Sequence, residues 1–244
     1  MQKLNSTLNA IMKIEISAKD RTDLMGKLAA IDISVPPRTQ GRTKDHCERW
    51  SICRWLSTYP YFHFSIKLTH RDRPDFLLET SDSEIGIEHT EAIPEDYAHA
   101  SAISERIDND ILPDISHFKW GQKKKKDEIY KIANMMELTG PGWKGDTPEI
   151  EWAQAVFEII QKKTNLLKKH EFQKYDENIL LIYDNLSLPF IDHSKAKATS
   201  ILRESLKSYW NDGLLFNKIF VQTDDLLIFF SQNKINTFEV NNVW

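Results

Sequence analysis

The sequence contains very little cysteine. Cys47 and Cys53 are the only two in 244 residues, and they lie six positions apart on a segment that is expected to be helical. A disulfide framework needs more cysteines, and a structural zinc site needs a recognisable cluster of ligands. We therefore expect neither, and we expect a reduced, cytoplasmic setting.

Long apolar runs are also missing. No stretch approaches the roughly 20 apolar residues that a membrane-spanning helix needs. The first residues, M-Q-K-L-N-S-T-L-N, lack the hydrophobic region of a secretory signal. We expect no membrane association. The sequence also has no G-x-S-x-G element and no recognisable Cys–His arrangement, which argues against an α/β hydrolase.

Positive charge is not in excess either. The chain has 32 lysine and arginine residues against 36 aspartate and glutamate residues, a net charge of -4. This balance does not point to nucleic-acid binding, but it permits it, because an enzyme can gather basic residues on one surface. The hydrophobic fraction of 41% is ordinary for a globular protein of one large or two small domains.

The most informative stretch is 73–91, R-P-D-F-L-L-E-T-S-D-S-E-I-G-I-E-H-T-E. Its apolar segments predict two short strands, 75–79 and 84–90. The polar residues 80–83 between them are turn formers. The stretch is therefore expected to be a β-hairpin.

Two carboxylates lie on this hairpin. Glu88 is near the end of the second strand, and Asp75 opens the first. Because side chains alternate along a strand, Glu88 and Thr90 share one face and His89 lies on the other. Carboxylates on adjacent strands are costly unless they are paired or bound to a cation, and a divalent metal is the simplest partner.

Pro74-Asp75, the hairpin and Glu88-His89-Thr90 together resemble the motif of the PD-(D/E)xK nuclease superfamily, with Thr90 at the position of the motif lysine. The resemblance implies that Asp75 and Glu88 bind Mg²⁺ or Mn²⁺, with the main-chain carbonyl of His89 as a further ligand. It also implies a lysine that positions or activates the attacking water. The sequence departs from the pattern at Thr90.

A later helix offers a replacement lysine. Helical periodicity covers 149–169, and Lys163 falls within its apolar stripe, between Ile160 and Leu166. Some PD-(D/E)xK proteins supply the lysine from the helix that follows the hairpin, which makes Lys163 the candidate and Lys162 the alternative. The other interpretation is that Lys163 only extends its amine to water.

A helix predicted over 45–58, with Asp45 as its N-cap, offers a further acidic residue. The resemblance implies that Glu48 adds a metal ligand from this helix. The competing interpretation is an exposed glutamate that pairs with Arg49 or Arg54.

Two basic segments are candidate contacts for nucleic-acid phosphates. They are also readily explained as solvated surface. Their residues are Lys123, Lys124, Lys125 and Lys126 in one run, and Arg38 and Arg42 in the loop 36–42.

The remaining periodicity completes an α/β pattern. It predicts one or two helices in 1–34, strand 61–68, a turn at 69–73, helix 95–111, a helix after the basic run, strand 178–183, helix 194–210, strands 216–222 and 226–230, and an edge strand in 237–244.

This order predicts a restriction-endonuclease-like core, in which helices flank a central mixed β-sheet. Residues 1–43 are expected to form an N-terminal helical extension. Residues 44–244 are expected to form the nuclease-like domain, with a helical insertion at about 95–148.

The expected function is a Mg²⁺-dependent endonuclease that hydrolyses phosphodiester bonds of DNA, in defence or DNA processing. DNA is the expected partner, and a homodimer is compatible with the sequence. The alternative is a catalytically inactive nuclease-like fold that serves as a nucleic-acid-binding or regulatory module. Thr90 and the acidic net charge favour this alternative.

Overall fold

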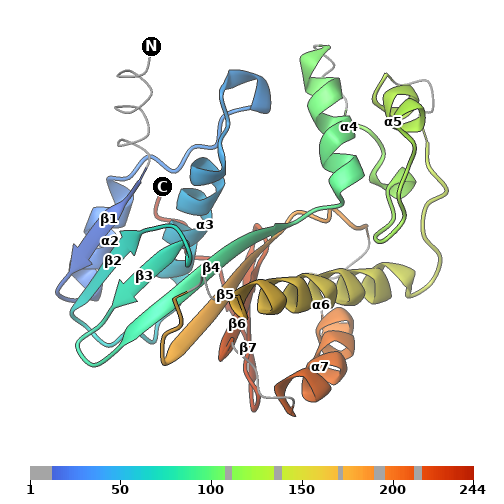
Figure 1. Ribbon diagram of the computed structural model, residues 1–244. Coiled ribbons are helices and arrows are strands. Elements are labelled where there is room, and N and C mark those ends of the chain that lie inside the picture. Colours follow the sequence, from blue (N-terminus) through green and yellow to red (C-terminus); the bar gives the residue numbers. More distant parts are fainter. Residues whose placement is uncertain (1–12, 108–111, 135–138, 170–172, 190–195, 212–215) are drawn as a thin grey trace.

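The strands form one mixed sheet in which strands adjacent in the sequence are also neighbours in space (Figure 1). The computed structural model describes residues 13–107, 112–134, 139–169, 173–189, 196–211 and 216–244. In these residues the strands are β1 (Glu15–Ala18), β2 (Ile66–His70), β3 (Phe76–Glu79), β4 (Glu84–Ala92), β5 (Glu177–Asp184), β6 (Lys218–Gln222), β7 (Leu226–Phe230) and β8 (Ile235–Glu239). The helices are α2 (Arg21–Ala29), α3 (Lys44–Thr58), α4 (Glu95–Arg106), α5 (Lys126–Ala133), α6 (Thr147–Leu167) and α7 (Ala196–Asn211), with short 3₁₀ turns η1 (Arg38–Gln40) and η2 (Ile115–His117).

The direction of pairing changes twice across the sheet. β1 to β4 are antiparallel neighbours, β4 to β6 are parallel, and β6 to β8 are antiparallel again. The parallel strands are joined by helical crossovers, as parallel pairing requires. The expected α/β class with a mixed sheet and flanking helices is therefore confirmed.

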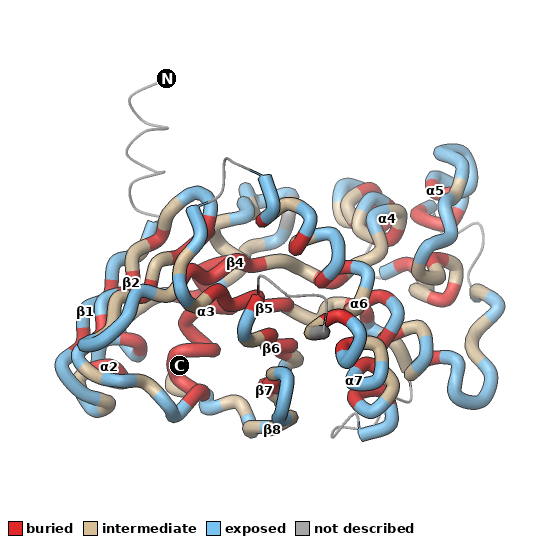
Figure 2. The backbone as a smooth tube through the Cα atoms, turned by 60° about the horizontal axis from the view of Figure 1, so that its bottom comes forward, coloured by how far each residue is buried: buried red, intermediate tan, exposed pale blue. Residues whose placement is uncertain are grey.

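Helices cover both faces of the sheet. On β5, Ile179 and Leu181 belong to the core formed with α2 and α3, whereas Leu180 and Ile182 belong to the core formed with α6 and α7. This alternation explains why the strand is apolar without interruption. Figure 2 shows the buried residues concentrated on α3 and on β4, β5 and β6. Helices α4 and α5 pack around a separate small core that contains Phe118 and project beyond the end of β4 (Figure 1).

The prediction of one or two helices in 1–34 is confirmed by α2, but it missed the strand β1 that precedes this helix. β1 pairs with β2 through Ile16 opposite Leu68, so this segment adds a strand to the sheet before α2 begins. A four-residue strand is too short to show a clear period of two in the sequence. Residues 1–12 of that prediction lie outside the described residues.

The strand predicted at 61–68, which precedes the hairpin, starts and ends later than expected. β2 begins at Ile66, and the segment 61–65 forms no strand; within it, the ring of Phe62 packs on Trp55 with the centroids 5.1 Å apart. The turn expected at 69–73 also starts later, since His70 is still paired with Phe76. The shift places His70 in the sheet, beside α3.

The other boundary differences are small. Thr43 caps α3 instead of Asp45, and its main-chain N–H donates to His46 Nδ1 at 3.1 Å. The edge strand β8 begins two residues earlier than predicted and ends at Glu239. The structure thus keeps the predicted order of elements from α3 to β8.

Candidate functional site

The end of the β3–β4 pairing fixes the position of Asp75. The two strands are in register up to Phe76 opposite Ile87, and β4 then continues without β3 beside it. The main-chain N–H of His89, in the part of β4 that β3 does not cover, donates to Asp75 Oδ2 at 2.7 Å. A buried N–H needs an acceptor, so the carboxylate replaces the strand and is itself held in place.

Glu88 lies on the face of β4 that α6 covers, and Lys163 of α6 reaches it. Lys163 Nζ is 2.8 Å from Glu88 Oε1 and 3.0 Å from the carbonyl oxygen of His89. The side chains of Lys163 and Glu88 are only 17% and 8% exposed. The structure therefore brings together Asp75, Glu88, the His89 main chain and the helix-borne lysine.

The pKa values of the two carboxyl groups are shifted in opposite directions, down for Asp75 and up for Glu88. Burial raises the pKa of Asp75, but the hydrogen bond and charge of Lys44, together with the His89 N–H, outweigh it and hold the pKa below its usual value. Burial and the charge of Asp75 raise the pKa of Glu88, although Lys163 opposes this. Neighbouring carboxyl groups cannot both ionise without cost, which explains the split.

Lys44, at the start of α3, joins Asp75 to Glu48. Its amine is 2.7 Å from Asp75 Oδ1 and 2.5 Å from Glu48 Oε1, and its side chain is 66% exposed. Glu48 itself is buried. The sequence-based alternative in which Glu48 is exposed and pairs with Arg49 or Arg54 is therefore wrong, and the structure places Glu48 near Asp75 through a shared cation.

Glu48 also belongs to a second group of possible ligands. Asp45, Glu48 and His70 each offer one ligand atom, and these atoms all lie within 4.8 Å of one another. His70 Nε2 is 2.9 Å from Glu48 Oε2 and 4.0 Å from Asp45 Oδ1. Imidazole and carboxylate donors together suit a divalent metal.

The Asp75–Glu88 pair also suits a divalent cation. Glu88 Oε2 is buried and has no hydrogen-bond partner among the described residues, which is costly for a carboxylate oxygen. Asp75 Oδ1 contacts the amine of Lys44, whose side chain is largely exposed. A hard cation with oxygen ligands would satisfy the first atom and replace the lysine at the second.

His89 does not present its ring to this site, because strand alternation puts it on the opposite face from Glu88. Burial lowers the pKa of His89 to about 3, so the ring is neutral. This agrees with a packed core histidine, and only the main chain of His89 takes part in the site. Thr90, on the same face as Glu88, lines an adjoining groove.

The basic residues proposed for phosphate contact do not act alike. Arg42 is part-buried, lies 3.5 Å from Glu91 and donates from Nε to Cys47 Sγ, so it is engaged internally. Lys123 Nζ lies 2.6 Å from Glu95 Oε2, while Lys124 packs its amine over Phe118. Lys125 and Lys126 are exposed at the start of α5, and Arg38 lies on η1.

Two residues of the site, Lys44 and His70, were missed in the sequence. The i,i+4 spacing of Lys44 and Glu48 was a usable signal, since such residues are neighbours on a helix. His70 gave no such signal, because it follows a polar turn-like sequence and its strand assignment depends on pairing with Phe76.

Comparison with protein-family models, with curated proteins and with solved structures finds no match to this chain. The functional interpretation therefore rests on the geometry of the site. Among the described helices, none has the length and apolar character needed to cross a membrane.

Lys163→Met is expected to lower the free energy of unfolding in EDTA by about 3 kcal/mol, because it leaves Glu88 buried without its partner. Mg²⁺ should then restore part of the loss. Chemical denaturation with and without Mg²⁺ measures both effects. Lys162→Met is the matched control, since Lys162 is 74% exposed and should change stability by less than about 0.5 kcal/mol. Equal behaviour of the two variants would contradict a role for Lys163 in balancing Glu88.

Lys44→Met is expected to tighten Mg²⁺ binding several-fold. The ammonium group competes with a cation for Asp75 and Glu48, and its removal leaves their charges uncompensated. Calorimetric titration of the variant and the wild type measures the change. Weaker Mg²⁺ binding by the variant would show that Lys44 does not occupy a cation position.

Proposed function

We propose that this protein is a divalent-metal-dependent nuclease that hydrolyses phosphodiester bonds of DNA. The observation that carries the proposal is the position of Lys163, whose amine meets Glu88 and the His89 carbonyl from α6. Thr90 leaves the usual lysine position of the PD-(D/E)xK motif without a cation, and Lys163 supplies one at the same carboxylate. In this protein, α6 would therefore be the source of the motif lysine.

Asp75, Glu88 and the main-chain carbonyl of His89 would hold Mg²⁺ or Mn²⁺, with Glu48 as a further acidic group near Asp75. When bound, such an ion lowers the pKa of a coordinated water and stabilises negative charge on the scissile phosphate. The His89 N–H orients Asp75, and Lys44 together with this N–H holds the pKa of Asp75 below its usual value. Lys163 donates to Glu88 and to the His89 carbonyl, and from this position its amine can orient a water molecule or contact a phosphate oxygen.

One observation favours a second candidate function. Lys44 bridges Asp75 and Glu48 and so neutralises part of the acidic site without any metal. A site balanced in this way suits a nuclease-like fold that binds nucleic acid or a regulatory partner without cleaving it. The acidic net charge also favours this second function.

Cleavage of plasmid DNA and of single-stranded DNA distinguishes the two candidates. The wild type is expected to cleave with Mg²⁺ or Mn²⁺ and to be inactive in EDTA. Asp75→Asn, Glu88→Gln and Lys163→Met should each reduce the rate by roughly 100-fold or more, the loss typical when one charge-stabilising group is removed. Gel analysis of timed digests gives the rates, and circular dichroism checks that each variant is folded.

Lys207→Met serves as the control and should keep nearly the wild-type rate, because Lys207 lies on α7 and pairs with Glu204 at 2.7 Å and not with Glu88. A folded wild type that cleaves no DNA with either metal would reject the nuclease proposal. The non-cleaving binding module would then be the remaining candidate. Cleavage that survives Lys163→Met would reject the role given to that lysine.

A further inference from the structure

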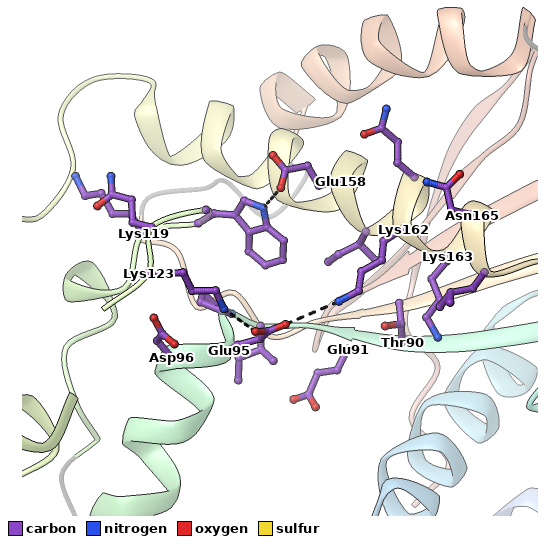
Figure 3. Close-up of a pocket in the computed structure, with 18 of the residues that line it drawn as sticks. Thr90, Glu91, Glu95, Asp96, Lys119, Lys123, Glu158, Lys162, Lys163 and Asn165 are labelled. Carbon is purple, nitrogen blue, oxygen red and sulfur yellow. Dashed lines mark hydrogen bonds and ion pairs between the residues drawn. The ribbon is translucent and has the colours of Figure 1, made fainter. Parts of the chain in front are cut away.

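A groove of about 970 Å³ opens beside Lys163. It is lined by the end of β4, the start of α4, the segment 119–123 and one side of α6 (Figure 3). Thr90 and Lys163 lie at its end nearest the carboxylates, so the groove is continuous with the candidate site. Its size is in the range of pockets that accept organic ligands.

The groove combines apolar and cationic side chains. Its apolar lining includes Ile93, Pro94, Trp120, Ile159 and Leu166. Besides Lys163, its lysines are Lys119, Lys123, Lys162 and Lys169. Aromatic and apolar surface flanked by lysines is the combination with which proteins bind unpaired bases and the phosphates that connect them.

Three of the acidic side chains that line the groove accept hydrogen bonds from neighbouring parts of the fold. Glu158 accepts from Trp120 Nε1 at 2.7 Å, and Asp96 accepts from the main-chain N–H of Lys124 at 2.7 Å. Glu91 accepts from Asn185 Nδ2 at 2.6 Å. These hydrogen bonds hold the three carboxylates in place, and Arg42, 3.5 Å from Glu91, offsets the charge of one of them.

Glu95 differs because it contacts two of the groove lysines at once. Its carboxylate lies 2.6 Å from Lys123 Nζ and 3.8 Å from Lys162 Nζ, as the dashed lines in Figure 3 show. The two lysines come from the segment before α5 and from α6, so Glu95 links the insertion to the core. All three side chains are at least 70% exposed, which means that the linkage is open to exchange with another anion.

We propose that this groove binds a single strand of nucleic acid and leads it to Lys163, and that Glu95 holds Lys123 and Lys162 until phosphates of the strand replace it. The inference rests on the proposed nuclease function and adds the substrate class. Unpaired bases can contact the apolar lining, whereas a duplex keeps its bases stacked inside and presents mainly phosphates. The preferred substrate is therefore single-stranded.

Glu95→Gln tests the proposal by a gain of binding. Freeing two lysines should tighten binding of a fluorescent single-stranded oligonucleotide, and should steepen the dependence of log K on log salt by roughly 1.4, or 0.7 for each new phosphate contact. Fluorescence anisotropy in EDTA measures binding without metal-dependent cleavage. The same titrations use single-stranded DNA, single-stranded RNA and duplex DNA.

Glu204→Gln is the matched control. Glu204 lies on α7, outside the groove, is 67% exposed and pairs with Lys207 at 2.7 Å, so the substitution removes the same charge and frees a lysine elsewhere. Its binding and salt dependence should equal those of the wild type. Tighter binding by Glu95→Gln alone, seen with single strands and not with duplex, supports the proposal.

Equal effects of the two substitutions would overturn the role of Glu95, and equal affinity for single strands and duplex would overturn the substrate class. Either result is compatible with Mg²⁺-dependent cleavage by the wild type, so the nuclease proposal would remain. Conversely, Glu95→Gln could tighten single-strand binding as expected while the wild type cleaves no nucleic acid. This result would support the groove as a binding site and reject the nuclease function. Tighter binding of RNA than of DNA would support the groove and change the substrate of the proposed nuclease to RNA.

Discussion

The site depends on the buried ion pair between Lys163 and Glu88. Glu88 lies on a strand that is covered by α6, where an unpaired carboxylate would be costly. Lys163 can neutralise this carboxylate only if α6 crosses β4 at one position, because its amine must reach both Glu88 and the His89 carbonyl. The pair therefore links the helical crossover to the strand that carries the candidate ligands. A buried pair of this kind specifies an arrangement more than it adds stability.

Two lysines and three acidic residues make the charge of the site nearly balanced. Lys163 serves Glu88, and Lys44 serves Asp75 and Glu48. The structure can therefore keep these carboxylates close without a bound cation. The two lysines differ in exposure, and this suggests different roles: the buried one is held by the fold, while the exposed one can leave when a cation enters. The lysine-lined groove then continues from the buried lysine toward the insertion.

Much of the fold was predictable because its central elements are long and strongly patterned. The apolar run of β5, the periodicity of α6 and the hairpin of β3 and β4 gave correct elements, and the gap in the stripe of α6 at Lys163 pointed to the carboxylates. The features that the sequence could not show are those that depend on pairing between distant segments. β1 is recognisable only by its partner β2, and the position of His70 depends on its register with β3. Arg42, in a loop that looked solvated, pairs internally with Glu91.

The central claim is that Asp75 and Glu88, beside Lys163, form the cation site. Anomalous scattering from crystals of the wild-type protein grown with Mn²⁺ tests it most directly, because it locates the ion without relying on activity. We expect a manganese peak in contact with the carboxylates of Asp75 and Glu88. A single peak held by Asp45, Glu48 and His70, with Lys163 still bonded to a metal-free Glu88, would contradict it.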